Sequence, residues 1–280
     1  MSDVLEQSLR ADHEEAPQPS GTWATALEKI RLPKPRIPTV VPPFEALGVL
    51  SERQRIRLRE EALRVNERYL REFIEGSSFC PYAKQGRRSG QTSRYVFLFE
   101  EPDVKPLVDL MKRISEDPKQ VVAQVILPLV DVDPEAWRKF CMDVTALGHH
   151  ELGKPVLACA PLHPSLPYSD ESMYSLVPLF RRAPDPTIQW VRLDGLDALY
   201  AGRGSDNEFV HIDNLGLFFQ KSSPPRPPLY DVVCKTNAAM ARRMTIERVV
   251  KTLDELAADG RRSYARILLD EATTETETQE

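Results

Sequence analysis

Short apolar segments alternate with amphipathic helical segments between residues 94 and 193, and this alternation constrains the fold more than any other feature of the chain. The strand-like segments are Arg94–Phe99, Val121–Leu127, Val156–Ala160 and Thr187–Leu193. The helical segments among them are Asp103–Ser115 and a segment that Asp133 caps and Gly148 ends. Such alternation is typical of strands joined by helical crossovers. We therefore predict an α/β protein, a layered sandwich with a mostly parallel central sheet.

Helical patterns flank this alternation on both sides. Apolar residues recur at helical spacing after Ser51, and Ser51 and Gln54 have the spacing of a capping box. A last helix is expected over Asn237–Ala258. Before it, residues 209–212 and 217–220 are expected to pair as a hairpin.

The composition changes towards both ends of the chain. Seven prolines lie between Pro17 and Pro43 with few large apolar residues among them, so residues 1–45 are predicted to be a disordered, proline-rich tail. Residues 263–280 are predicted to be an acidic, disordered tail. Between them we predict a single α/β domain over residues 46–262.

Charge and hydropathy exclude several classes of protein. The net charge of -5 gives no general attraction to nucleic acids or anionic membranes, and no apolar run is long enough to span a bilayer. The N-terminal residues lack the apolar core of a signal peptide, so we expect a cytoplasmic protein. The four cysteines have no CxxC spacing, which is unlike a zinc ribbon or a dithiol motif. We predict no metal site, and the sequence identifies no cofactor.

Cys80 is the first candidate for a reactive group. It follows the first helix, and the cationic residues Lys84, Arg87 and Arg88 come soon after it. Positive charge near a thiol favours the reactive thiolate. The alternative is a buried cysteine that only packs, as expected of Cys141 and Cys159 in their apolar segments.

His163 is the second candidate. It lies between two prolines just after a predicted strand, and ligands of open α/β sheets gather beyond the strand ends. A histidine in this position is suited to proton transfer near neutral pH. The alternative is a histidine whose ring is hydrogen-bonded within a turn. A metal site built from Cys80, His149, His150 and His163 is not indicated by their spacing.

Two arginines and an asparagine are candidates for binding an anion. Arg182 follows Arg181 and precedes a proline-rich turn, and Arg192 lies at the end of the next strand. Arginine pairs bind carboxylates and phosphates at two points. Asn237 either contacts the ligand or caps the last helix. Ordinary surface arginines are the alternative for Arg182 and Arg192.

Several short motifs occur in an order that resembles a known family. The segment Phe79-Cys80-Pro81-Tyr82-Ala83-Lys84, Arg94-Tyr95-Val96, His163-Pro164, the run from Arg182 to Arg192, and Thr236-Asn237 are the matching islands. They resemble an uncharacterised bacterial family, a domain of unknown function whose members carry Leu-Cys-Pro-Phe-Ala after a first helix. Gln189 stands where that family usually has a histidine.

The resemblance implies one composite site rather than a reaction. It would join Cys80, Arg94, His163, Arg182, Arg192 and Asn237. On this basis the leading hypothesis is a thiol-dependent enzyme that acts on a small anionic metabolite, with Cys80 as the thiol and His163 as the proton carrier. The alternative is a non-catalytic ligand-binding or adaptor protein whose proline-rich segments, residues 32–38 and 224–228, bind a protein partner.

Overall fold

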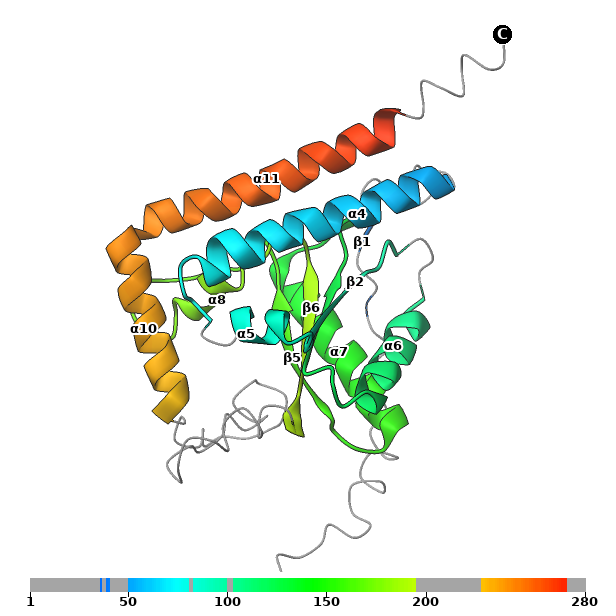
Figure 1. Ribbon diagram of the computed structural model, residues 1–280, viewed down its shortest axis with the longest axis horizontal. Helices are drawn as coiled ribbons and strands as arrows, with labels where there is room; N and C mark the ends of the chain where they lie inside the picture. The colour runs from blue at the N-terminus through cyan, green and yellow to red at the C-terminus, as the bar shows by residue number, and fades with distance from the viewer. Residues whose placement is uncertain are drawn as a thin grey trace, which may run out of the picture.

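A computed structural model describes residues 36, 39–40, 50–80, 83–99, 103–194 and 228–270. Helices and a central sheet are both present, so the prediction of an α/β protein is confirmed (Figure 1). The expected hairpin over residues 209–220 lies outside the described residues, as do both proline-rich segments apart from Arg36 and Pro228. None of the described helices is both long and apolar enough to cross a membrane.

The central sheet has four strands in the order β2-β3-β6-β5. They are β2 (Thr92–Val96), β3 (Val122–Ile126), β5 (Leu157–Leu162) and β6 (Thr187–Arg192). β2 and β3 are parallel, whereas β6 is antiparallel to β3 and to β5. The sheet is therefore mixed, and the predicted mostly parallel sheet is not confirmed.

The antiparallel course of β6 follows from the segment that connects it to β5. Leu162, the last residue of β5, pairs with Thr187, the first residue of β6. The connection leaves and re-enters the sheet at the same end, and its one helix, α8 (Val177–Phe180), has only four residues. Without a crossover to the opposite end, the returning strand must run antiparallel.

Two helices connect the first three strands and pack against each other, α6 (Lys105–Glu116) and α7 (Pro134–Leu152). As predicted, Asp133 caps α7, because its side chain accepts hydrogen bonds from the backbone of Glu135 and Ala136. The predicted end at Gly148 is wrong. Gly148 lies inside the helix against Met111, where a side chain would collide, and the left-handed residue Gly153 (φ 69°) ends α7.

The other long helices lie before the first strand and after the last strand of the central sheet in the sequence. The predicted capping box of Ser51 and Gln54 starts α4 (Glu52–Arg68), which continues directly into the π-helix η1 (Tyr69–Glu75). The expected last helix is two helices, α10 (Pro228–Met244) and α11 (Ile246–Asp270), separated at Thr245, where φ is 66°. Asn237 therefore lies inside α10 and is not a helix cap, and α11 continues past residue 262, our predicted domain end.

A short strand comes from the segment that we predict to be a disordered tail. β1 (Thr39–Val40) pairs antiparallel with β4 (Val130–Asp131), which directly precedes α7. The rest of residues 1–49, apart from Arg36, lies outside the described residues.

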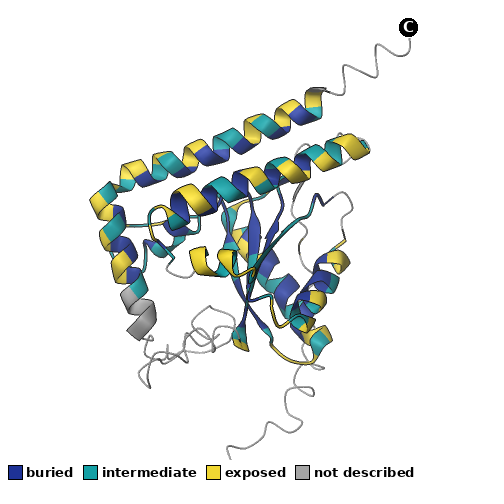
Figure 2. Cartoon of the chain, viewed as in Figure 1, coloured by how far each residue is buried: buried dark blue, intermediate teal, exposed yellow. Residues whose placement is uncertain are grey.

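The strands separate two apolar cores, and buried residues fill both sides of the sheet (Figure 2). The first core joins α6, α7 and part of α4 to the sheet, and includes Trp137 and Trp190. Trp190 and its cross-strand neighbours Ala123 and Cys159 belong to this core. The second core contains η1, α8, α10 and much of α11, and includes Phe73 and Phe180.

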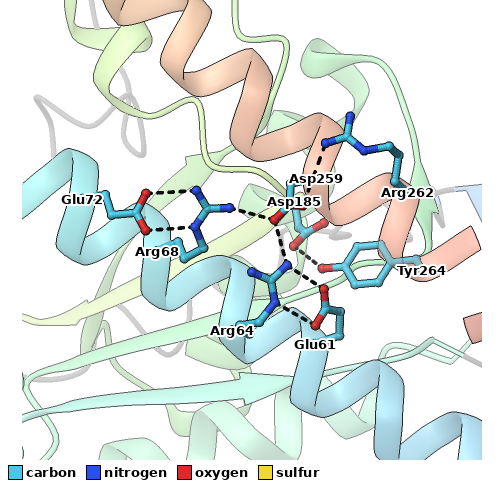
Figure 3. A network of polar contacts seen from close by, with 8 residues as sticks. All are labelled: Glu61, Arg64, Arg68, Glu72, Asp185, Asp259, Arg262 and Tyr264. Carbon is cyan, nitrogen blue, oxygen red and sulfur yellow. Dashed lines mark hydrogen bonds and ion pairs between the residues drawn. The ribbon is translucent and has the colours of Figure 1, made fainter. Parts of the chain in front are cut away.

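Charged side chains join α4 to α11, which lie side by side in Figure 1. Asp259 accepts hydrogen bonds from Arg64 (2.8 Å) and Arg68 (2.7 Å), and Glu61 and Glu72 hold these arginines from the other side (Figure 3). Because the network is partly exposed, it orients the two helices more than it stabilises them.

Candidate functional site

A cavity of about 340 Å³ lies under the π-helix, and we call it the η1 cavity. The helical walls come from η1 and the segment that follows it, from α5 (Ala83–Arg88), and from α8 and α10. The sheet contributes the first residues of β2 and β3, the second half of β5 and the middle of β6. Most of the lining is apolar. A mostly apolar cavity of this size with few polar groups is typical of a site for a small organic ligand.

The π-helix itself shapes this cavity. Its backbone bonds span five residues, as from Gly76 N to Arg71 O (3.0 Å), and Phe79 N continues the pattern to Ile74 O (2.9 Å). The wider turn places Tyr69, Leu70 and Ile74 on the cavity wall. π-Helical turns are uncommon and often occur at functional sites.

Cys80 lies on the wall of the η1 cavity, directly after the chain leaves η1. The chain turns there through Ser78, which has a φ of 56°. The Cys80 side chain is half-buried, and a second thiol, that of Cys234 on α10, lines the same cavity but is buried. Neither cysteine forms a disulfide.

Arg181 lines the cavity and has no counter-ion among the described residues. Its guanidinium makes no ion pair and no hydrogen bond with any residue that the structure describes. Its charge favours the ionised form of Tyr69, but burial outweighs that effect and raises the pKa of Tyr69. Tyr69 stays neutral and donates a hydrogen bond to the carbonyl of Phe180 (2.8 Å).

The sheet side of the cavity carries a cross-strand pair of glutamines. Gln124 on β3 lies opposite Gln189 on β6, and Gln124 Nε2 donates to Gln189 Oε1 at 2.9 Å. Gln124 is 3% exposed, and its Oε1 has no hydrogen-bond partner among the described residues. Asn237 on α10 also lines the cavity, and its side chain has no hydrogen-bond partner among the described residues.

An ion pair ties α5 to the π-helix beside the cavity. Arg87 donates from Nε and Nη2 to the two carboxylate oxygens of Glu75, at 2.7 and 2.8 Å. The hydrogen bonds from Arg87 lower the pKa of Glu75, whose side chain is 9% exposed. This two-point contact holds α5 against η1.

His163 lies in a different cavity, of about 720 Å³, which we call the α11 cavity. Its walls are residues 128–134, 163–165, 184–186 and one face of α11. His163 Nε2 contacts Val132 O at 2.9 Å, and Nδ1 accepts a hydrogen bond from Ser165 N at 3.1 Å. Nε2 is therefore the protonated nitrogen, and burial lowers the pKa of His163.

Asp185 and Tyr264 are two further buried titratable groups of the α11 cavity. Tyr264 on α11 donates a hydrogen bond to Asp185 Oδ2 at 2.8 Å (Figure 3). Burial raises the pKa of Asp185 to about 7, an effect that the Tyr264 hydrogen bond only partly offsets. Sequence reasoning missed this pair because Asp185 lies in a proline-rich turn that indicates exposure.

The three predicted arginines line neither cavity. Arg94 pairs with Glu67 at 2.5 Å, and Arg182 donates to Pro164 O (2.6 Å) and to Asp254 (3.2 Å). Arg192 is the last residue of β6, at the end of the strand away from Thr187. It binds Asp194 and, through Nη1, the carbonyl of Ser115 (2.8 Å). Of the six predicted site residues, the structure brings only Cys80 and Asn237 to the η1 cavity.

The other described cysteines and histidines lie outside both cavities. Cys141 and Cys159 are buried in the first core, where burial raises the pKa of both thiols, that of Cys159 to about 12. His149 accepts a hydrogen bond from Leu157 N (3.3 Å), and burial lowers its pKa to about 4. Within the described ranges, no three His, Cys, Asp or Glu side chains are grouped as metal ligands would be.

Comparison of the chain with protein-family models, with curated proteins and with solved structures finds no match. Sequence reasoning placed Arg182 in the predicted site, named Arg181 only as its neighbour, and missed Gln124 and the π-helix. A signal existed only for Arg181, as the first of two adjacent arginines, because a single glutamine in an apolar strand has no distinguishing pattern.

Proposed function

We propose that the protein binds a small organic anion with an apolar body in the η1 cavity. The observation that carries this proposal is Arg181, a cavity-lining arginine without an ion pair among the described residues. A buried or half-buried cation is stabilised when an anion occupies the space beside it, and the guanidinium group suits a carboxylate or a phosphate. The apolar walls favour the ligand's hydrocarbon part.

Binding is favoured over catalysis because of what lines the η1 cavity. Among its described lining residues there is no histidine, and the one carboxylate, Glu75, is already paired with Arg87. Tyr69 is held neutral, with its hydroxyl bonded to Phe180. A nucleophilic thiol is usually activated by a base such as histidine, and the described lining of the η1 cavity contains no histidine.

A thiol-dependent reaction on the bound anion is the second candidate. It is favoured by one observation, that Cys80 is half-buried in the same cavity as Arg181. A cation near the sulfur favours the thiolate without a base. In this case Cys80→Ser abolishes turnover and leaves anion binding unchanged.

Thermal denaturation with a panel of ligands tests the proposal. Hexanoate, benzoate and phenyl phosphate are compared at fixed ionic strength with hexanol, which has the apolar body but no charge. The proposal predicts that at least one anion raises the melting temperature and that hexanol raises it less. If no anion stabilises the protein beyond an equal concentration of chloride, the η1 cavity is not an anion site.

A further inference from the structure

The glutamine pair on the sheet side of the η1 cavity has an incomplete set of hydrogen bonds. Gln124 Nε2 is bonded to Gln189 Oε1, but Gln124 Oε1 is buried and has no partner among the residues that the structure describes. A buried carbonyl oxygen without a partner destabilises the protein, so such groups are uncommon in interiors. Because Gln124 lines the cavity, a group that binds there can supply the missing donor.

The pair offers both kinds of hydrogen-bonding group. Gln189 also lines the cavity and is half-buried, and no contact of its Nε2 is recorded among the described residues. The pair therefore has an unused acceptor on Gln124 and an unused donor on Gln189. Exchanging the oxygen and nitrogen in both side chains leaves the same complement, one acceptor and one donor.

From these groups we infer that the η1 cavity recognises a carboxylate whose far end carries a carboxamide. This inference rests on the proposed anion site and adds the second polar group of the ligand. A carboxamide has an N–H donor for Gln124 and a carbonyl acceptor for Gln189 on adjacent atoms. A protonated amine has donors only and satisfies Gln124 alone, whereas a hydroxyl must serve both glutamines from a single oxygen atom.

The topology separates the carboxamide from the carboxylate. Gln124 and Gln189 form one cross-strand row with Ala160 on β5, and Leu162 lies two residues further along that strand. Two strand residues span about 7 Å. Arg181 adjoins the end of β5, because its carbonyl accepts a hydrogen bond from His163 N (3.1 Å). The two polar ends of the ligand are therefore separated by a short apolar chain, which contacts the apolar walls.

Two ligands of the same shape test the inference in the wild-type protein. The first is adipamate, the monoamide of adipic acid. The second is its isopropyl analogue, in which –CH(CH₃)₂ replaces –CONH₂. Isothermal titration should show adipamate binding roughly tenfold tighter, because an amide moved from water into an apolar site is favoured only where it finds its hydrogen bonds.

Variants locate the effect at the glutamine pair. Gln124→Met and Gln189→Met should each reduce the preference for adipamate to about twofold or less, while binding of the isopropyl analogue stays within twofold of wild type. Gln85→Met is the matched control, since Gln85 lines the cavity from α5 and is exposed. It should leave the preference unchanged.

The outcomes separate this inference from the proposed function. If the isopropyl analogue binds as tightly as adipamate or more tightly, the carboxamide inference is overturned and the anion site stands. If neither compound binds the wild-type protein, the anion site fails and the inference fails with it. The wild-type comparison decides the question even if Gln124→Met does not fold.

Discussion

The η1 cavity and the α11 cavity differ in where their buried polar groups find partners. In the α11 cavity, both ring nitrogens of His163 are hydrogen-bonded and Asp185 is bonded to Tyr264. In the η1 cavity, Arg181 and the Oε1 atom of Gln124 have no partner among the described residues. The fold itself satisfies the first set, and we propose that a ligand completes the second. A polar group left unsatisfied in a lined cavity is therefore a better guide to a site than a conspicuous residue type.

Thiol reactivity provides the largest expected contrast between the η1 cavity and the core. Burial raises the pKa of Cys159 to about 12, which lowers its thiolate fraction by roughly a thousandfold relative to a thiol at 9.0. Cys80 is half-buried on a cavity wall. Timed alkylation with iodoacetamide and peptide mapping should label Cys80 at least about a hundredfold faster than Cys159. Labelling of Cys80 only after denaturant is added would show that the η1 cavity is closed to small molecules.

Asp185 in the α11 cavity should make the stability of the protein depend on pH. The pKa of Asp185 is about 7 in the folded protein against 3.8 for an ordinary aspartate, so the native state binds more protons than the unfolded state between these values. Stability from this group is full below pH 4 and is lost as the pH rises through 7. Asp185→Asn removes this loss. The difference in free energy of unfolding between the variant and the wild type should therefore increase, in favour of the variant, by roughly 4 kcal/mol from pH 4 to pH 8.

Urea unfolding at several pH values measures this effect. The exposed Asp170 provides the control, and Asp170→Asn should follow the wild-type curve. Parallel curves for wild type and Asp185→Asn would mean that Asp185 ionises freely, and the described difference between the cavities would then be wrong.

His163 should matter for stability and not for anion binding. His163→Ala removes the buried imidazole together with its hydrogen bonds to Val132 O and from Ser165 N, so it should lower the free energy of unfolding by about 2–3 kcal/mol. The affinity for a carboxylate should stay within twofold of wild type. His150→Ala, at an exposed position of α7, is the control. Loss of anion binding in His163→Ala without loss of stability would place His163 in the binding site.

The smallest expected effect concerns access to the η1 cavity. Glu75→Gln removes the charge that holds Arg87 and α5 against η1, and alkylation of Cys80 should become about threefold to fivefold faster. Glu135→Gln breaks a similar but exposed pair with Arg138 on α7 and should change nothing. Equal rates in both variants would show that α5 does not control entry.

Local sequence signals predicted individual elements of the fold well. The capping box of Ser51 and Gln54, the Asp133 cap and the four strands of the sheet all follow from side chains within a few residues of one another. Strand direction did not follow, because it depends on where the connection from β5 to β6 re-enters the sheet. The extension of α7 past Gly148 depends on close packing against Met111, a residue of another helix.

The candidate site was predicted only in part, for the same reason. Cys80 and Asn237 reach one cavity, but the adjacent arginines differ: Arg181 lines the η1 cavity, and Arg182 binds Pro164 O and Asp254. Sequence reasoning could not distinguish the two arginines, since the surrounding fold decides which of two adjacent guanidinium groups finds a partner. The partner of a side chain is a tertiary property, and it separates binding groups from structural ones.

The central claim is that Arg181 in the η1 cavity binds an organic anion, and isothermal titration of hexanoate into Arg181→Gln and Arg88→Gln tests it most directly. Both variants remove one positive charge, but Arg88 is exposed on α5 and does not line the cavity. The account predicts that Arg181→Gln binds hexanoate roughly 10- to 100-fold more weakly than wild type, while Arg88→Gln stays within twofold. Equal loss in both variants, or unchanged affinity in Arg181→Gln, would contradict it.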